Sequence, residues 1–99
     1  MSTVEERICE LVEAYQAGDP RRFAPDADVV DARGRWRRGA REIVAAPVAP
    51  ARSVSIRFLG AGDVALVHLG GDGVTTLVLS RERGIWRIDA AHTSGTKGD

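Results

Sequence analysis

Asp31 and His92 are the residues of this sequence best suited to acid–base chemistry. A carboxylate held in an apolar cavity has its charged form disfavoured, so its pKa rises and it becomes a usable base near neutrality. A period-two strand pattern predicts that His92 shares a face with Trp86, Ile88 and Ala90. If that face lines a cavity, His92 and Asp31 could form a catalytic acid–base pair.

Both residues also have a structural interpretation. Asp31 stands beside a predicted turn at Arg33-Gly34, where it would pair with Arg33 or Arg35. His92 lies near the end of a predicted strand, where backbone carbonyls can satisfy its ring nitrogens. Residue types and spacing leave these alternatives open.

Four further side chains are candidate substrate-binding residues. Tyr15 and Thr76 could offer polar contacts, and Trp36 and His68 are weaker candidates. Trp36 belongs to a basic segment, residues 33–38, which could hold an anion or stack on single-stranded nucleic acid. The formal net charge of zero, from 14 basic and 14 acidic side chains, favours a solvated hairpin with Trp36 packed inward. We therefore expect no nucleic-acid partner.

The sequence predicts neither a metal site nor a cofactor. Cys9 is its one cysteine, which excludes an intrachain disulfide and a cysteine-based metal cluster. Because Cys9 adjoins the apolar stripe of a predicted helix, we expect a small core residue. The histidines have too few further ligands at useful spacing to form a metal centre.

The N-terminal part of the chain predicts a helix and a hairpin. An amphipathic helix is expected over Val4–Ala17, capped by Ser2 with Glu5 or by Thr3 with Glu6 and ended by Gly18. Residues 21–24 could add one more helical turn. A short hairpin turns at Arg33-Gly34, and a second, short helix is expected over residues 40–46, ended by prolines.

The C-terminal part of the chain predicts four strands joined by short turns. They are expected over Ser53–Leu59, Val64–Leu69, Val74–Ser80 and Ile85–Thr93. Connections this short require antiparallel pairing, because a parallel crossover needs a dozen or more residues. One face of the resulting sheet must bury the first helix, and a curved sheet around a helix leaves a cavity at its open end.

Several motifs, in this order, resemble the nuclear-transport-factor-2-like superfamily, particularly its SnoaL-like and calcium/calmodulin-kinase association-domain-like members. The motifs are Ala17-Gly18-Asp19, Asp26-Ala27-Asp28-Val29-Val30-Asp31, Gly39-Ala40-Arg41-Glu42-Ile43, Asp63-Val64-Ala65-Leu66-Val67 and Gly84-Ile85-Trp86-Arg87-Ile88 with His92-Thr93-Ser94. The resemblance implies a single α+β cone over residues 1–94, with a cystatin-like curved antiparallel sheet around the N-terminal helix. Residues 95–99 are expected to be a disordered tail.

The resemblance also bears on function. Asp31 matches the position where steroid-isomerase-like members carry their general base, but Leu11 and Thr76 stand where that enzyme places its oxyanion-binding Tyr and neutral Asp. Steroid isomerisation by that mechanism is therefore not expected. The helices that wall the pocket are shortened. The implied function is binding of a small lipophilic ligand, with acid–base catalysis of a cyclase, isomerase, dehydratase or epoxide hydrolase type as its enzymatic form.

The alternative function is non-catalytic assembly as a homodimer through the outer sheet face. That face would carry Leu77 and Leu79 if Thr76 and Val78 point inward. No stretch predicts a signal peptide or a membrane span, so no membrane partner and a cytoplasmic location are expected.

Overall fold

Helix α1 (Val4–Ala17) opens the chain in the computed structural model, which describes residues 3–31, 34–39, 42–43, 51–71 and 73–94. Thr3 caps it: the Glu6 amide donates to the Thr3 hydroxyl over 3.1 Å, and the Thr3 amide donates to the Glu6 carboxylate over 3.0 Å. Gly18 ends the helix in the left-handed conformation at φ 73°. The predicted helix bounds are confirmed, and of the two predicted capping boxes the structure forms the one at Thr3.

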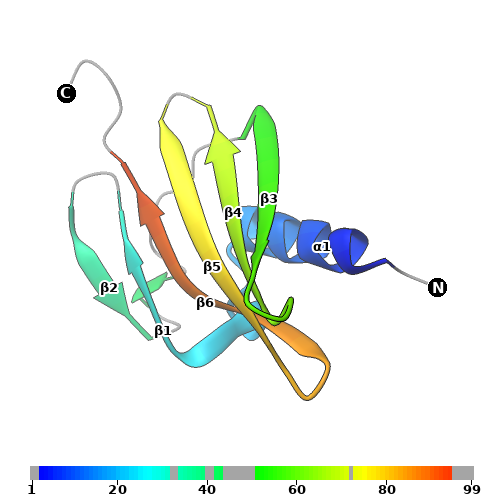
Figure 1. Cartoon of the computed structure of the whole chain (residues 1–99). Coiled ribbons are helices and arrows are strands. Elements are labelled where there is room, and N and C mark those ends of the chain that lie inside the picture. The colour runs from blue at the N-terminus through cyan, green and yellow to red at the C-terminus, as the bar shows by residue number, and fades with distance from the viewer. Residues whose placement is uncertain (1–2, 32–33, 40–41, 44–50, 72, 95–99) are drawn as a thin grey trace.

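The strands form one six-stranded curved sheet in the order β2-β1-β6-β5-β4-β3 (Figure 1). A short 3-10 turn, η1 (Pro20–Arg22), leads into the sheet. The strands are β1 (Phe23–Val30), β2 (Trp36–Arg38), β3 (Ser53–Leu59), β4 (Val64–Gly70), β5 (Val74–Glu82) and β6 (Ile85–Thr93). Neighbouring strands pair antiparallel except β1 and β6, which run parallel. The predicted hairpin and the four antiparallel strands are therefore confirmed.

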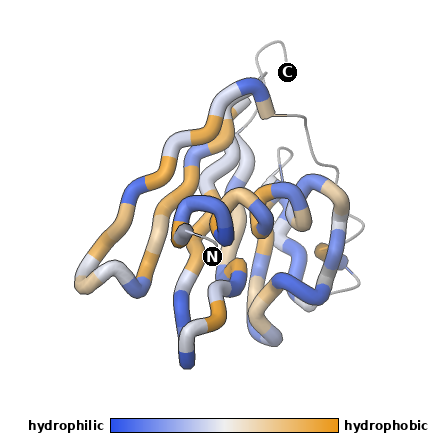
Figure 2. The backbone as a smooth tube through the Cα atoms, turned by 90° about the vertical axis from the view of Figure 1, so that its right-hand side faces the viewer, coloured by the Kyte–Doolittle hydropathy of each residue, from blue (hydrophilic) through white to orange (hydrophobic). Residues whose placement is uncertain are grey.

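Helix α1 crosses one face of the sheet, called here the inner face, and the opposite face is called the outer face (Figure 1). Hydrophobic positions recur along the strands (Figure 2), and burial alternates along β4 and β5, because successive side chains point to opposite faces. The inner side chains and the apolar side of α1 form one buried core. Its residues are Ile8, Leu11, Val12, Tyr15, Phe23, Ala27, Val29, Ile43, Ala65, Val67, Leu69, Leu77, Leu79, Trp86, Ile88 and Ala91.

A bulge in β6 changes which side chains face the core. Val78 pairs with Ala90, but the next residue of β5, Leu79, pairs with Ile88, so Asp89 is an extra residue on β6. The core-facing positions of β6 therefore shift from Ile88 to Ala91. For this reason His92 shares a face with Ala90, as predicted, but the prediction that it shares one with Trp86 and Ile88 is wrong.

Strand β5 has the opposite orientation from the one considered for the assembly alternative. Leu77 and Leu79 are fully buried on the inner face, and Thr76 and Val78 point outward. The assignment of Leu77 and Leu79 to the outer face is wrong, because helix α1 covers the side of the sheet that carries the larger apolar residues.

Other boundaries differ modestly from the predictions. Residues 21–24 divide between η1 and the start of β1, so the strand starts at Phe23. Of the helix predicted over residues 40–46, only Glu42 and Ile43 are described, with the Ile43 amide donating to the Gly39 carbonyl over 3.0 Å. Residues 95–99 lie outside the described residues. No helix in the described part of the chain is long and apolar enough to cross a membrane.

Candidate functional site

Asp31 is a buried carboxylate held by the β1–β2 hairpin, with 3 % of its surface exposed. Its Oδ1 accepts a hydrogen bond from the Arg35 backbone amide over 3.0 Å. Its Oδ2 forms an ion pair with Arg37 Nε over 3.1 Å. Arg37 is anchored in turn, because its Nη1 donates to the Glu42 carbonyl over 3.3 Å. Arg37 thus compensates the buried charge, and the backbone amide orients the carboxylate.

Three hydroxyl groups meet on the inner face of the sheet. Thr75 Oγ1 and Thr93 Oγ1 lie 3.0 Å apart, and the Tyr15 side chain from α1 hydrogen-bonds to both threonines. Burial raises the pKa of Tyr15 above its usual value, while the hydrogen bonds with Thr93 and Thr75 act in the opposite direction. The Tyr15 phenol is therefore neutral at ordinary pH and available for hydrogen bonding.

Strand register brings the carboxylate and the hydroxyls to the same end of the sheet. Val30 pairs with His92 across the parallel β1–β6 ladder, so the next residues, Asp31 and Thr93, lie at one level on adjacent strands. We call Tyr15, Asp31, Arg37, Thr75 and Thr93 the inner polar cluster. Among the described residues, no buried side-chain nitrogen or oxygen lacks a hydrogen-bond partner.

Two hydroxyls of this cluster were missed in the sequence. Thr76 was the threonine predicted to bind substrate, but it points to the outer face, whereas Thr75 and Thr93 face the core. The β-branched run of β5 gives no indication of which threonine is inward. Thr75 shares the face of Leu77 and Leu79, which the structure buries, but the sequence alone does not say which face is inward.

The histidines lie on the outer face. His92 pairs with Thr76, and Thr76 pairs with His68, so the three side chains form a row across β6, β5 and β4. His92 is exposed and His68 is half-buried. The structure therefore separates His92 from Asp31 by the thickness of the sheet, and the two predicted catalytic residues are not brought together.

Two further expectations fail because the side chains are solvent-exposed. Trp36 is 56 % exposed on the edge strand β2, with Nε1 donating to Asp28 Oδ2 over 3.1 Å and the Arg38 guanidinium 3.8 Å from the ring centroid. It does not pack inward, because neighbouring polar groups hold it on the surface. Cys9 is exposed on α1 and is not a core residue.

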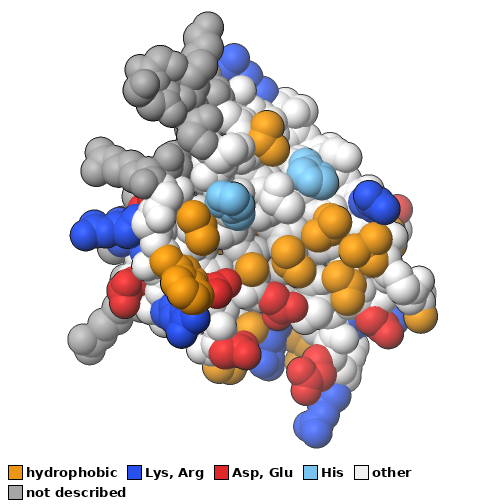
Figure 3. All heavy atoms as spheres, turned by 60° about the vertical axis from the view of Figure 1, so that its left-hand side comes forward, with side chains coloured by type: hydrophobic (Ala, Val, Ile, Leu, Met, Phe, Trp, Pro, Cys, Tyr) orange, Lys and Arg blue, Asp and Glu red, His pale blue; other side chains and the backbone are white. Residues whose placement is uncertain are grey.

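The outer face carries an apolar patch at its centre (Figure 3). Both histidines of the chain lie within this patch, and acidic side chains gather along one side of it (Figure 3). We call the half-buried apolar residues the outer patch. They are Val30, Val64, Leu66, Val78 and Ala90.

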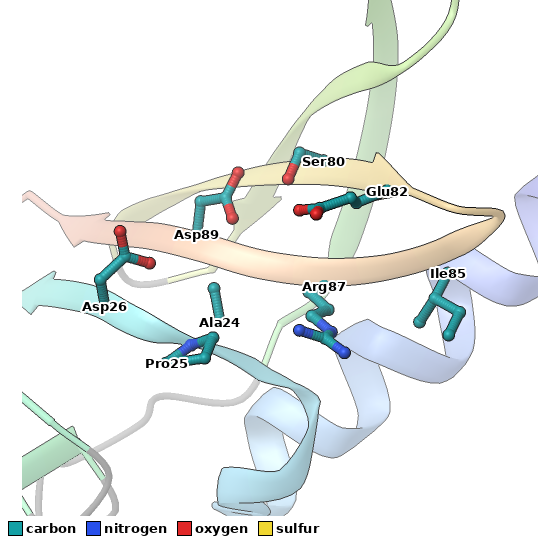
Figure 4. Close-up of a pocket in the computed structure, with 8 residues that line it drawn as sticks. All are labelled: Ala24, Pro25, Asp26, Ser80, Glu82, Ile85, Arg87 and Asp89. Carbon is teal, nitrogen blue, oxygen red and sulfur yellow. The ribbon is translucent and has the colours of Figure 1, made fainter.

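A hollow of about 340 Å³ opens beside this patch, between β1, β6 and β5 (Figure 4). It forms where the β1–β6 register jumps from Phe23 opposite Ile88 to Asp28 opposite Ala90, so β1 bends away from its neighbour. The lining residues are Ala24, Pro25, Asp26, Ser80, Glu82, Ile85, Arg87 and Asp89. This hollow, whose lining includes the carboxylates of Asp26, Glu82 and Asp89, was not predicted. Within the described ranges, no group of three or more His, Cys, Asp or Glu side chains could hold a metal ion.

Comparison with known proteins supports the fold. No protein-family model and no curated protein sequence matches the chain. Solved structures do match. An NTF2-like protein of unknown function from Prochlorococcus sp. NATL2A superimposes with a TM-score of 0.77 at 14 % identity, covering 99 % of this chain and 97 % of that one.

Two other solved structures give the same result. An uncharacterised protein with a cystatin-like fold from Caulobacter vibrioides has a TM-score of 0.68 at 22 % identity, covering 96 % of this chain and 91 % of that one. A protein assigned to the calcium/calmodulin-dependent kinase II association domains, from Exiguobacterium sibiricum, has a TM-score of 0.72 at 12 % identity, covering 100 % and 98 %. The chain therefore has the nuclear-transport-factor-2-like, cystatin-like α+β fold that its motifs predicted.

Proposed function

We propose that this chain is an assembly domain that forms a homodimer through the outer face of its sheet. The observation that carries the proposal is the outer patch. A sheet covered by a helix on one face normally presents polar side chains to water on the other. Here Leu66, Val78 and Ala90, at the centre of the outer face, are apolar and only half-buried. A second copy of the same face would remove them from water.

The surroundings of the patch support the same function. Charged side chains stand at the margin, with Arg57 beside Leu66 on one side and Asp28 beside Ala90 on the other. An apolar centre with a charged rim is the usual composition of a protein–protein interface. The Exiguobacterium structure with this fold is assigned to the association domains of a kinase, and self-association is the activity proposed here for the present chain.

The Val78→Arg variant tests this interface. Val78 points away from the core, so an arginine there leaves the inner packing intact and places a charge in the centre of the proposed contact. We expect the dimer dissociation constant to rise by about 30-fold or more, the effect of losing a central interface residue. Sedimentation velocity over a concentration series measures it. Gln16→Arg adds the same charge on the exposed side of α1 and serves as the matched control.

Two results would reject the assembly function. One is a wild-type chain that stays monomeric up to millimolar concentration. The other is a Val78→Arg variant that dimerises as tightly as Gln16→Arg.

A second candidate function is binding of a small lipophilic ligand at the inner polar cluster. The meeting of three hydroxyls at the end of the sheet that carries the Asp31–Arg37 pair favours it. Tyr15 and Thr93 would hydrogen-bond the polar group of the ligand, and the ion pair would orient it. In an enzymatic form, Asp31 would act as the acid–base residue without His92. A thermal-shift screen of small lipophilic compounds tests this function. Stabilisation that survives in Tyr15→Phe and Thr93→Val variants would contradict binding at this cluster.

A further inference from the structure

Strand β3 is an open edge of the sheet. It pairs with β4 on one side, and among the described residues no strand pairs with its other side (Figure 1). Alternate backbone amides and carbonyls along this side therefore point away from the sheet. An edge of this kind is a template for a further strand, and natural proteins usually protect it with lysines, prolines or bulges.

The sequence of β3 carries little of that protection. Ser53–Leu59 contains neither proline nor lysine, and Arg57 is its one charged residue. On the inner face of the strand, Val54 is 48 % exposed and Phe58 is 40 % exposed. Helix α1 leaves both side chains partly open to solvent. Within the described part of the chain, the edge thus offers backbone groups without a strand partner and partly exposed apolar side chains.

The strand is self-complementary in one antiparallel register. If two copies of β3 pair about a two-fold axis at Ile56, all seven residues of each strand find a partner. Val54 then faces Phe58 of the other copy on the inner face, and Ser55 faces Arg57 on the outer face. Val54 and Phe58 thus form apolar cross-strand pairs, Leu59 lies opposite Ser53, and each arginine faces a serine rather than the other arginine.

We propose that β3 is a second interface, at which two copies join edge to edge in this register to form one continuous sheet. The interface is distinct from the centre of the outer patch, although Arg57 and Leu59 of β3 adjoin the margin of that patch, beside Leu66 and Val64. The partner is a second copy of this chain, since the same strand supplies both halves of a matched pattern. The two interfaces together produce assemblies larger than a dimer.

A charge-swap pair of variants tests the register. Val54→Lys with Phe58→Lys places like charges opposite one another at both ends of the proposed pairing. Val54→Glu with Phe58→Lys places opposite charges there. Within one chain the two positions are four residues apart, roughly 13 Å along the strand, so attraction inside the chain is weak in buffered salt. Both double variants lose the edge-on contact of Phe58 with Trp86 equally, so this loss does not distinguish them.

Sedimentation velocity of the full chain reports the result. We expect the lysine pair to raise the dissociation constant of one association step at least tenfold, and the glutamate–lysine pair to restore that step. Because Val78→Arg removes the other step, repeating the series in that background separates the two interfaces. Equal association of the two charge variants would overturn the proposal, whether or not the outer patch forms a dimer. The proposal would also be overturned if hydrogen exchange of the β3 amides in the wild-type chain did not slow as protein concentration rises.

Discussion

Replacement of Asp31 by asparagine is the sharpest test of the inner polar cluster. The change keeps the shape of the side chain and removes its charge. The asparagine oxygen could still accept the Arg35 amide, but its NH2 group would face Arg37 Nε, which is also a donor. Arg37, with 16 % of its side chain exposed, would be left without its counter-charge.

The expected cost follows from these contacts. Removing one partner of a fully buried ion pair costs about 3–5 kcal/mol, and partial access of solvent to Arg37 lowers this to about 2–4 kcal/mol. For a domain of this size each kcal/mol shifts the melting temperature by about 4–8 °C, so a fall of roughly 8–32 °C is expected. Urea unfolding gives the free energy directly, provided that the transition is two-state.

An exposed ion pair provides the control. Asp63 is 56 % exposed and pairs with Arg81 over 2.6 Å, so Asp63→Asn should cost about 1 kcal/mol or less. The variant combining Asp31→Asn with Arg37→Met should recover part of the lost stability, because it no longer leaves a buried cation without its counter-charge. If Asp31→Asn destabilises the chain no more than Asp63→Asn does, the reasoning about the buried pair is refuted.

Three smaller perturbations have outcomes set by single contacts. Thr3→Ala should lower the unfolding free energy by about 1 kcal/mol while Thr3→Ser does not, and equal loss in urea unfolding would contradict the capping role. Tyr15, the one tyrosine, should titrate above its ordinary pKa of 10.0 in the folded chain. Its contribution to the stability of the fold is complete below pH 10.0 and is lost as pH rises through the folded pKa. Ultraviolet absorbance titration with and without urea measures the shift, and equal titration in the two conditions would contradict it. The hydrogen bond from Arg21 lowers the pKa of Asp19 from 3.8 to about 2. The contribution of Asp19 to the stability of the fold is therefore present above pH 3.8 and lost as pH falls towards 2. Asp19→Asn should flatten the acid limb of the curve of stability against pH, and an unchanged limb would argue against the bond.

The elements whose bounds were predicted correctly are those that local chemistry determines. Helix α1 has an apolar stripe between a capping box at Thr3 and a left-handed glycine at Gly18, so residues close in sequence determine both of its ends. Strands β3 and β6 were also predicted to the residue, because turns and breaks in the apolar pattern bound them. These signals identify elements without information from the rest of the chain.

Which face a strand turns to the core is not a local property. In β5 both faces are apolar or β-branched, and only the position of α1 decides that Leu77 is inward and Val78 outward. The same difficulty hid the inner hydroxyls, because Thr75 and Thr76 are adjacent residues of one type. Asp31 could be singled out in the sequence, but its partner Arg37 could not be distinguished from the other arginines of the hairpin.

The bulge at Asp89 is the feature that most changes the functional interpretation. A shift of one residue exchanges the two faces of a strand, and nothing in the sequence around Asp89 signals one. With regular alternation after Ile88, His92 would point inward toward Asp31 and the pair would resemble an acid–base site. With the bulge, Ala91 takes the core position and His92 joins His68 on the outer face. The polar groups on the inner face then already have hydrogen-bond partners, while the apolar groups on the outer face remain partly exposed to water. Association removes exposed apolar surface from water. The bulge is therefore the structural reason for proposing assembly ahead of catalysis.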